Sequence, residues 1–109
     1  MTTINTTKHK VRLSTTEINA IRAAVSRQLG DGACIRIFGS RARKNEKGGD
    51  IDILIETEQQ LSSRVATACR LASELQIQLG DQKIDIIIAD PATQEQTIHQ
   101  IARQKGVVL

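Results

Sequence analysis

The sequence predicts an α/β sandwich, in which helices pack against a small mixed β-sheet. Apolar residues recur at helical spacing in three segments, and shorter runs rich in β-branched residues lie between them. The expected order is α-β-β-α-β-α, in a single domain that spans residues 1–109. Because 39% of the residues are hydrophobic and one residue is aromatic, the core must be aliphatic.

The first predicted helix follows residues 1–12, which are mostly polar and which we expect to form a flexible tail. Ser14 and Glu17 have the spacing of a capping box, in which each side chain binds the backbone of the other residue. Apolar residues then follow at helical spacing as far as Leu29, and Gly30 is a natural stop.

Two strands and a loop come next. The segment 33–38 is short and rich in β-branched residues, so we expect it to be the first strand. The polar and basic segment 39–49 is expected to be mostly loop. The run 51–55 is expected to be the second strand.

The second half adds a helix, a strand and a helix. An apolar stripe over 61–79, closed by Gly80, predicts the second helix, and it includes Val65. The third strand is expected over 83–89. Thr93 is the expected cap of a third helix that ends before residue 106.

Composition excludes several classes of function. The net charge of +3 is small, and with Phe38 as the one aromatic residue the chain lacks the stacking platforms of single-strand nucleic-acid binders. Cys34 and Cys69 stand 35 residues apart without a CxxC motif, so we expect two reduced thiols. Apolar runs fall short of the roughly 20 residues that span a bilayer. We therefore expect a cytoplasmic protein without a membrane partner.

The pair Asp50 and Asp52 is the first chemical signal. Side chains two residues apart in a strand project from the same face, so both carboxylates can converge on hard cations. Mg²⁺ prefers oxygen ligands and often shares its site with substrate phosphates. An exposed polar face of an edge strand is the alternative, but aspartate is a poor strand former.

Asp85 strengthens this interpretation because it lies in an otherwise apolar strand, where a buried charge needs a partner or a metal. If the second and third strands are neighbours, Asp85 can lie beside Asp52, and three carboxylates then share one pocket. A salt bridge from Asp85 to Lys83 or to an arginine remains the alternative.

Gly39 and Ser40 follow the first strand directly, where glycine lets the backbone approach a phosphate closely. A short helix that begins there would direct further N–H groups at an anion. His9 and His99 have no partner at metal spacing, so we expect them to be solvated or capping residues. A GxxxxGK[ST] motif is missing, which excludes a P-loop NTPase.

The run Gly39-Ser40-Arg41-Ala42-Arg43, followed by Asp50-x-Asp52, resembles the signature of the DNA polymerase β-like nucleotidyltransferase superfamily. Size and content resemble its minimal nucleotidyltransferase (MNT) branch, as in HEPN/MNT toxin–antitoxin pairs, over nearly the whole chain. Lys44 stands where many relatives have glycine, and the loop is one residue shorter. The resemblance is therefore weaker for the basic residues of this loop.

The resemblance implies a polymerase β-like fold and a nucleotidyltransferase that uses two Mg²⁺ ions and ATP or another triphosphate. It implies that three carboxylates bind metal and carry catalysis and that four residues bind the nucleotide phosphates, namely Asp50, Asp52 and Asp85 for the metal and Gly39, Ser40, Arg41 and Arg43 for the phosphates. It also implies a helical HEPN-type protein partner, whose hydroxyl would receive AMP, so the chain would act as an antitoxin and protein adenylyltransferase.

Two other functions compete with this one. The chain could mask a HEPN-type partner without catalysis. The presence of all three aspartates argues against this, because an enzyme that has lost its activity is free to lose its metal ligands. A phosphatase of the haloacid dehalogenase type needs Asp-x-Asp-x-Thr, but Ile53 and Leu54 follow Asp52. The sequence identifies neither the acceptor nor the preferred base, and it leaves a homo-oligomer open.

Overall fold

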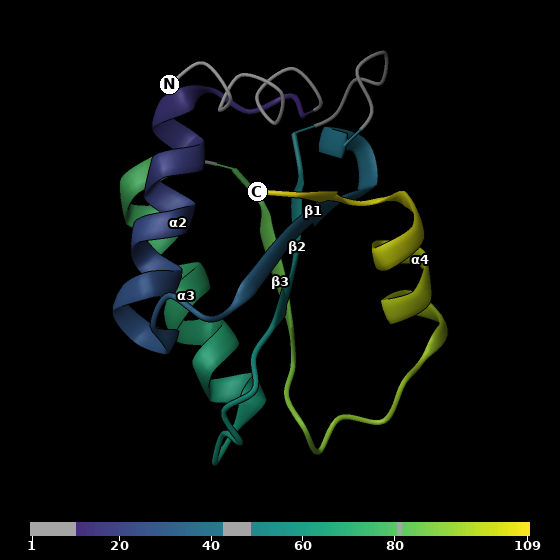
Figure 1. The fold of residues 1–109 in the computed structure, drawn as a ribbon. Coiled ribbons are helices and arrows are strands. Elements are labelled where there is room, and N and C mark those ends of the chain that lie inside the picture. The colour runs from purple at the N-terminus through teal and green to yellow at the C-terminus, as the bar shows by residue number, and fades with distance from the viewer. Residues whose placement is uncertain (1–10, 43–48, 81) are drawn as a thin grey trace.

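A computed structural model describes residues 11–42, 49–80 and 82–109. Its centre is a four-stranded mixed sheet in the order β3-β2-β1-β4, with helices on both faces (Figure 1). β2 pairs antiparallel with β1 and parallel with β3, so the predicted fold class is confirmed. The strands are β1 (Cys34–Phe38), β2 (Ile51–Glu56), β3 (Ile84–Ala89) and β4 (Val107–Val108).

The two faces of the sheet are covered by different numbers of helices. α2 (Thr15–Leu29) and α3 (Arg64–Leu79) cover one face, and α4 (Thr97–Lys105) lies on the other (Figure 1). The larger aliphatic core lies under α2 and α3, while a smaller cluster lies under α4 and contains Phe38, Leu54 and Ala102. β1, β2 and β3 therefore each contribute residues to two different cores.

The alternation is clearest in β2. Its odd-numbered residues are fully buried in the core under α2 and α3, and they are Ile51, Ile53 and Ile55. Its even-numbered residues turn to the α4 face, where Leu54 joins the smaller core. Asp52 consequently projects from the same face as α4, away from the large core.

The predicted capping box is present at α2. Ser14 Oγ accepts a hydrogen bond of 3.1 Å from the Glu17 N–H, and Glu17 Oε1 accepts one of 2.8 Å from the Ser14 N–H. Such a cap contributes about 1 kcal/mol to helix stability. Gly30 follows the last helical residue, as predicted.

The other two helices begin later than predicted. α3 begins at Arg64 because the Ser63 hydroxyl caps it, accepting from the Ala66 N–H at 3.0 Å. α4 begins at Thr97 with Gln96 as its cap, and the expected cap Thr93 instead donates its hydroxyl to Asp90. A capping pattern predicts that a helix begins, but competing side-chain partners decide at which residue.

Three further details differ from the prediction. β4 was not expected, because two valines are too short a run to show strand periodicity, yet they pair with β1. Val11 is 5% exposed and belongs to the core, so the expected tail is held by the fold at this residue, while residues 1–10 lie outside the described residues. Val65 is 74% exposed, so it does not belong to the buried stripe of α3.

The cysteine prediction is confirmed, since Cys34 and Cys69 are free thiols. Among the described residues, the helices are too short or too polar for any of them to cross a bilayer.

Asp90 directly follows β3, and its carboxylate binds residues at and just before the start of α3. Its carboxylate accepts hydrogen bonds from the Leu61 N–H at 3.0 Å, the Ala92 N–H at 3.0 Å and Arg64 Nη1 at 2.8 Å. The Leu61 N–H is the largest cause that lowers the pKa of Asp90 to about 2, and Arg64 adds to it. The charged form is therefore favoured in the folded chain.

An acid whose pKa is depressed by folding stabilises the fold above its unfolded pKa and loses that stabilisation as the pH falls through its folded pKa. The contribution of Asp90 should therefore be complete at neutral pH and decline between about pH 4 and about pH 2. Urea unfolding at several pH values should show that Asp90→Asn is less stable than wild type at neutral pH and less sensitive to acid. Glu58→Gln, which changes an exposed acid after β2, is the control, and its stability should depend on pH as that of wild type does.

Candidate active site

Asp52 lies at the centre of the candidate site. In the sheet register it stands between Phe38 of β1 and Asp85 of β3. Because register partners project from the same face, the Asp52 and Asp85 side chains lie next to each other on the α4 face. The sequence predicted that Asp85 could lie beside Asp52, and the structure places it there.

The pKa of Asp52 is raised. Burial is the largest cause, and the charges of Asp85 and Asp50 add to it, while Lys83 acts in the opposite direction. Burial and the two neighbouring carboxylates therefore disfavour a negative charge at Asp52. A cation bound at this carboxylate would relieve the repulsion.

Gly39 forms the floor beneath the Asp52 carboxylate. Its φ is +71°, a conformation that favours glycine. A Cβ atom at this position would lie 2.2 Å from Asp52 Oδ2 and 3.2 Å from Asp52 Cγ. The carboxylate can therefore occupy its place only because residue 39 has no side chain.

Asp85 lies beside Asp52 as predicted, whereas Asp50 lies outside the register of the sheet. Asp50 precedes β2 and is exposed, and within the described ranges no three His, Cys, Asp or Glu residues form a group that could hold a metal ion. The register of β2 and β3 places Asp85 beside Asp52, and Asp50 at the rim is still close enough for its charge to raise the pKa of Asp52. The role of Asp50 as a ligand remains a prediction.

Asp85 is also more exposed than predicted. Its side chain is 53% exposed, because β3 is the outer strand of the sheet and this residue lies near its beginning. Lys83 Nζ lies 3.9 Å from Asp85 Oδ2, so the salt bridge considered as an alternative is present as well. A solvent-exposed ion pair of this length is weak and does not prevent another cation from binding.

The residues predicted to bind phosphate occupy different positions. The short helix expected after β1 is present as a 3-10 helix, η1 (Gly39–Ala42), which contains Gly39, Ser40 and Arg41. The guanidinium of Arg41 donates to protein oxygens, including the carbonyl of Arg12 at 2.7 Å. Arg43 lies outside the described residues.

The donor set fits Mg²⁺ in its chemistry. Proteins commonly bind this ion through one or two carboxylates, and substrate phosphates and water complete the octahedron. Asp52 and Asp85 supply two such carboxylates on one face, next to the glycine that begins the short helix after β1. A metal that arrives with a nucleotide would find two of its ligands here.

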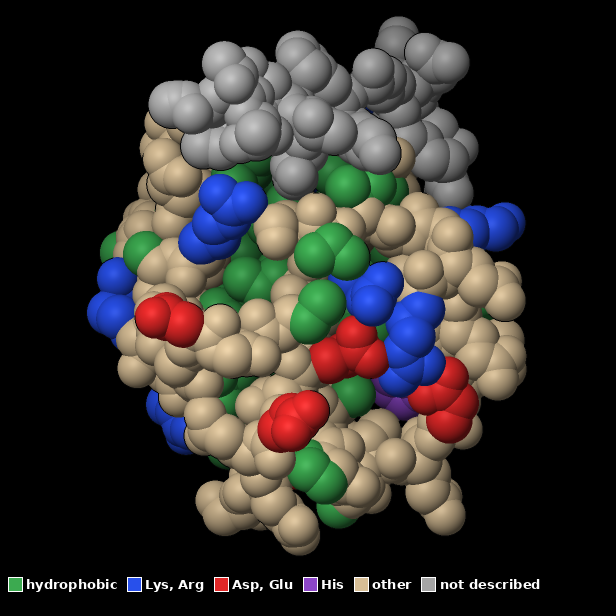
Figure 2. Space-filling model, in the orientation of Figure 1, with side chains coloured by type: hydrophobic (Ala, Val, Ile, Leu, Met, Phe, Trp, Pro, Cys, Tyr) green, Lys and Arg blue, Asp and Glu red, His purple; other side chains and the backbone are tan. Residues whose placement is uncertain are grey.

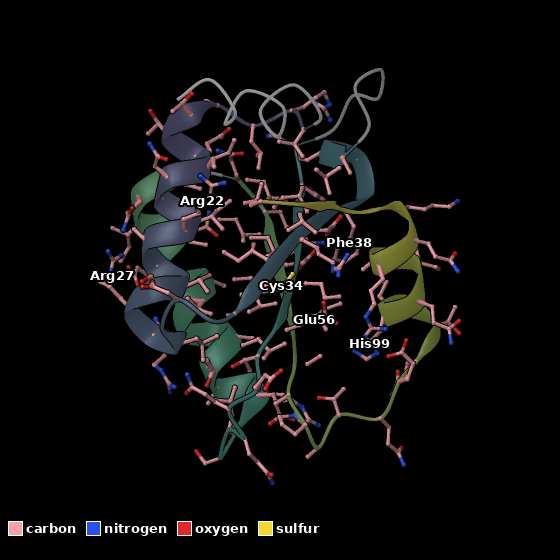
Figure 3. The ribbon with its side chains drawn as sticks, viewed as in Figure 1. Arg22, Arg27, Cys34, Phe38, Glu56 and His99 are labelled. Atoms are coloured by element: carbon pink, nitrogen blue, oxygen red, sulfur yellow. The ribbon has the colours of Figure 1, made fainter. Side chains whose placement is uncertain are left out.

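A row of alternating charges continues the same face of the sheet toward α4, and sequence reasoning missed it. Glu56 accepts from Arg36 Nε at 3.0 Å and from Arg103 Nε at 2.7 Å, and Arg103 also pairs with Glu95. Although burial opposes it, these two arginines lower the pKa of Glu56. Figure 2 shows acidic and basic side chains gathered beside α4, and Figure 3 shows Glu56 on the side of β2 that faces this helix. The row fixes α4 against the sheet.

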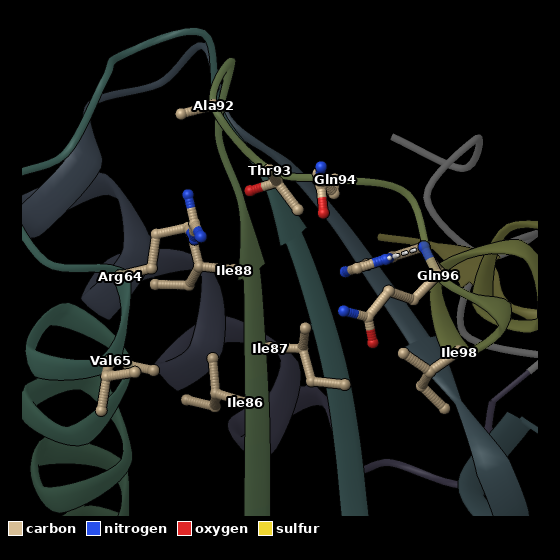
Figure 4. A pocket seen from close by; sticks show the side chains of 12 residues that line it. Arg64, Val65, Ile86, Ile87, Ile88, Ala92, Thr93, Gln94, Gln96 and Ile98 are labelled. Carbon is tan, nitrogen blue, oxygen red and sulfur yellow. Dashed lines mark hydrogen bonds between the residues drawn. The ribbon is translucent and has the colours of Figure 1, made fainter.

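His99 has the capping role that the sequence suggested. Its Nδ1 accepts from the Gln96 N–H at 2.9 Å, as the dashed line in Figure 4 marks, and the residue is 6% exposed. It lines a cavity of about 610 Å³ along the outer edge of β3, with Val65, Ile87 and Ile98 (Figure 4). None of the residues that line this cavity has a carboxylate, so the pair Asp52 and Asp85 is the better candidate for binding the metal of a triphosphate.

Comparison with known proteins agrees with this geometry. A family model described as "Polymerase beta, Nucleotidyltransferase" matches residues 19–109. No curated protein matches the chain.

Two solved structures are similar in fold. The first is a mutant of the MntA–HpeT toxin–antitoxin, with 23% identity and a TM-score of 0.64 over 84% of this chain and 69% of that one. The second is a tri-AMPylated HEPN toxin of Shewanella oneidensis in complex with its MNT antitoxin, with 22% identity and a TM-score of 0.63 over 84% of this chain and 67% of that one. The family match covers most of the sequence and includes every residue of the candidate site, so the chain belongs to the polymerase β nucleotidyltransferase family.

Proposed function

We propose that the chain is a Mg²⁺-dependent nucleotidyltransferase that transfers AMP from ATP to a hydroxyl group of a protein partner. The observation that carries this proposal is the pairing of Asp52 with Asp85 above Gly39. Two adjacent carboxylates on one sheet face, packed closely against a glycine at the start of a short helix, fit the metal of a triphosphate.

The residues of the chain have distinct tasks in this reaction. Gly39 and Ser40 would offer a turn against which the triphosphate lies, and Asp52 and Asp85 would hold the metal, with Asp50 at the rim. Because Asp85 is half exposed on the outer strand, an acceptor hydroxyl can reach it from solvent, and its carboxylate can take the proton of that hydroxyl. The acceptor oxygen attacks the α-phosphorus, and pyrophosphate leaves.

When bound, two Mg²⁺ ions would neutralise phosphate charge and lower the pKa of the acceptor hydroxyl. Most of the catalytic contribution of the protein is then positioning and charge compensation.

The nature of the acceptor is supported by two observations. Both similar structures are toxin–antitoxin complexes, and in one of them the toxin is AMPylated. This chain contains no tyrosine, so it cannot label itself on that residue. We infer that the acceptor is a hydroxyl, and specifically a tyrosine, of a separate HEPN-type toxin, and that the chain is its cytoplasmic antitoxin.

The experiment incubates the purified chain with ATP labelled at the α-phosphate, Mg²⁺ and the protein encoded by the neighbouring gene. Mass spectrometry should find AMP on a hydroxyl of that partner, and nucleotide without the partner should give little product. Omitting Mg²⁺ should abolish the adduct. Efficient transfer to a sugar or an antibiotic by the isolated chain would contradict the proposal.

A non-catalytic masking subunit is the second candidate, and the exposed apolar residues beside the outer strand favour it. Val65 is 74% exposed and Ile98 is 38% exposed. In that case the chain would neutralise the partner without ATP, and the partner would carry no adduct.

A further inference from the structure

The guanidinium of Arg41 is largely enclosed by the protein, with 14% of the side chain exposed. Nη1 donates to the Arg12 carbonyl at 2.7 Å, and Nη2 donates to Gln82 Oε1 at 2.9 Å and to the Gly49 carbonyl at 3.4 Å. Glu17 Oε1 lies 4.0 Å from Nη1. Nε is buried and has no hydrogen-bond partner among the described residues, but the two terminal nitrogens, Nη1 and Nη2, would have to release their protein oxygens before they could bind a phosphate.

The partners of Arg41 belong to the segments that carry the candidate site. Gly49 directly precedes Asp50 at the entry to β2, and Gln82 lies three residues before Asp85 of β3. Arg41 itself belongs to the turn that contains Gly39. One side chain therefore links the proposed phosphate turn to both acidic strands.

The turn is also held from its other side. The Arg12 N–H donates to the Arg41 carbonyl at 2.8 Å, and Arg12 Nη2 donates to the Ser40 carbonyl at 3.2 Å. Ser40 and Arg41, the two residues after Gly39, are thus tied to the segment before α2. This leaves the Gly39–Ala42 turn little freedom to shift relative to the sheet.

Gln82 is oriented by α2 and α3. Its Nε2 donates to Glu17 Oε2 at 2.9 Å and to the Leu79 carbonyl at 3.2 Å, which directs its Oε1 at Arg41. Although burial opposes it, hydrogen bonds from Ser14 and Gln82 and the charge of Arg41 lower the pKa of Glu17. Glu17 therefore has two roles: it caps α2, and it orients Gln82, which binds Arg41.

We propose that Arg41 is a positioning residue, which fixes the distance between the Gly39–Ala42 turn and the carboxylates of β2 and β3. This inference rests on the proposed function and replaces the phosphate contact that the sequence suggested for Arg41. Arg41 acts through Gly49 and Gln82 and does not touch the nucleotide.

The test compares Arg41→Met, Gln82→Leu and the double variant in steady-state AMP transfer to the partner, well below the unfolding temperature and with folding checked by circular dichroism. Displacement of a reacting group by about 1 Å can cost on the order of 10²-fold in rate. We expect kcat to fall by up to this factor in Arg41→Met while KM for ATP changes little. Gln82→Leu should lower kcat in the same way, and the double variant should be no worse than Arg41→Met, because the two residues act as one unit.

A second readout needs no catalysis. Isothermal titration of Mn²⁺ into the chain without nucleotide should show weaker binding in Arg41→Met than in wild type, since the separation of the carboxylates changes. A phosphate ligand would give the opposite pattern, with an increased KM for ATP, unchanged Mn²⁺ binding and a normal Gln82→Leu variant. Arg27→Met, which removes a surface arginine of α2 paired with Glu74, is the matched control and should leave kcat, KM and Mn²⁺ binding unchanged.

The outcomes separate the two proposals. If wild type neither transfers AMP nor binds Mn²⁺, the proposed function fails and the positioning role fails with it. If wild type is active and Arg41→Met lowers the free energy of unfolding but leaves kcat and Mn²⁺ binding intact, Arg41 is a structural residue only. In that case the positioning role alone is overturned.

Discussion

Replacing Asp52 by asparagine should lower AMP transfer on the order of 10²- to 10³-fold and leave the domain folded. The carboxamide keeps the shape of the side chain but removes the charge that would hold the metal beside Asp85. The loss should appear in kcat, because the metal stabilises charge that develops at the α-phosphorus. Transfer at the wild-type rate would show that the metal site has been misassigned.

The same variant should not be less stable at neutral pH, and the sign follows from the raised pKa of Asp52. The folded chain binds a proton at Asp52 more tightly than the unfolded chain does, so any stabilisation is present at low pH and is lost as the pH rises through the raised pKa. At neutral pH the ionised carboxylate opposes folding through burial and through repulsion by Asp85. Asparagine removes this cost, so the urea midpoint should be equal to that of wild type or higher.

Glu58→Gln is the control for charge, since Glu58 is an exposed acid just beyond the far end of β2. It should change neither the rate of transfer nor the urea midpoint. A lower midpoint in Asp52→Asn would mean that a partner in the fold stabilises the charged carboxylate. It would contradict the interpretation that Asp52 and Asp85 repel each other when no cation is bound.

Gly39→Ala should have the second largest effect. The positive φ costs about 1 kcal/mol or more once a Cβ is present. The new methyl group would also lie 2.2 Å from Asp52 Oδ2, so the carboxylate must move. Because a displacement of about 1 Å can cost on the order of 10²-fold, transfer should fall far more than the loss of stability explains.

Gly80→Ala is the matched control, since Gly80 has a φ of +82° and a Cβ there would meet nothing within 4 Å. Urea unfolding should show a similar loss of stability in both variants, whereas transfer should fall in Gly39→Ala alone. Equal rates per folded molecule in the two variants would show that the position of the Asp52 carboxylate does not matter.

The sequence predicts those parts of the fold that depend on local periodicity. The aliphatic alternation in β2 predicts which residues enter the large core, and therefore that Asp52 and Leu54 face the other way. The capping box at Ser14 is equally local, because both of its bonds form within one helical turn. Even the proximity of Asp52 and Asp85 follows from one assumption, that β2 and β3 are neighbours.

What the sequence does not predict depends on contacts between distant segments. Arg41 meets Gln82 across 41 residues, and no spacing rule relates them. The exposure of Asp85 follows from the position of β3 at the edge of the sheet, which the order of elements does not determine. β4 is stabilised by its pairing with β1 and not by any pattern of its own. Residues of the loop that includes Arg43 lie outside the described residues, so their predicted role is untested.

The outer position of β3 has a consequence for how this chain could acquire new acceptors. Asp52 lies in a central strand with a neighbouring strand on each side, while Asp85 lies in a strand at the edge of the sheet. The two carboxylates of the proposed site therefore differ in how much of the fold surrounds them. The groups that surround Asp85 belong to the surface of the molecule and contribute little to its core. Substitutions on the surface around Asp85 could therefore change which acceptor is recognised at a small cost in folding free energy. Asp52, which the fold constrains, would stay in place for the chemistry.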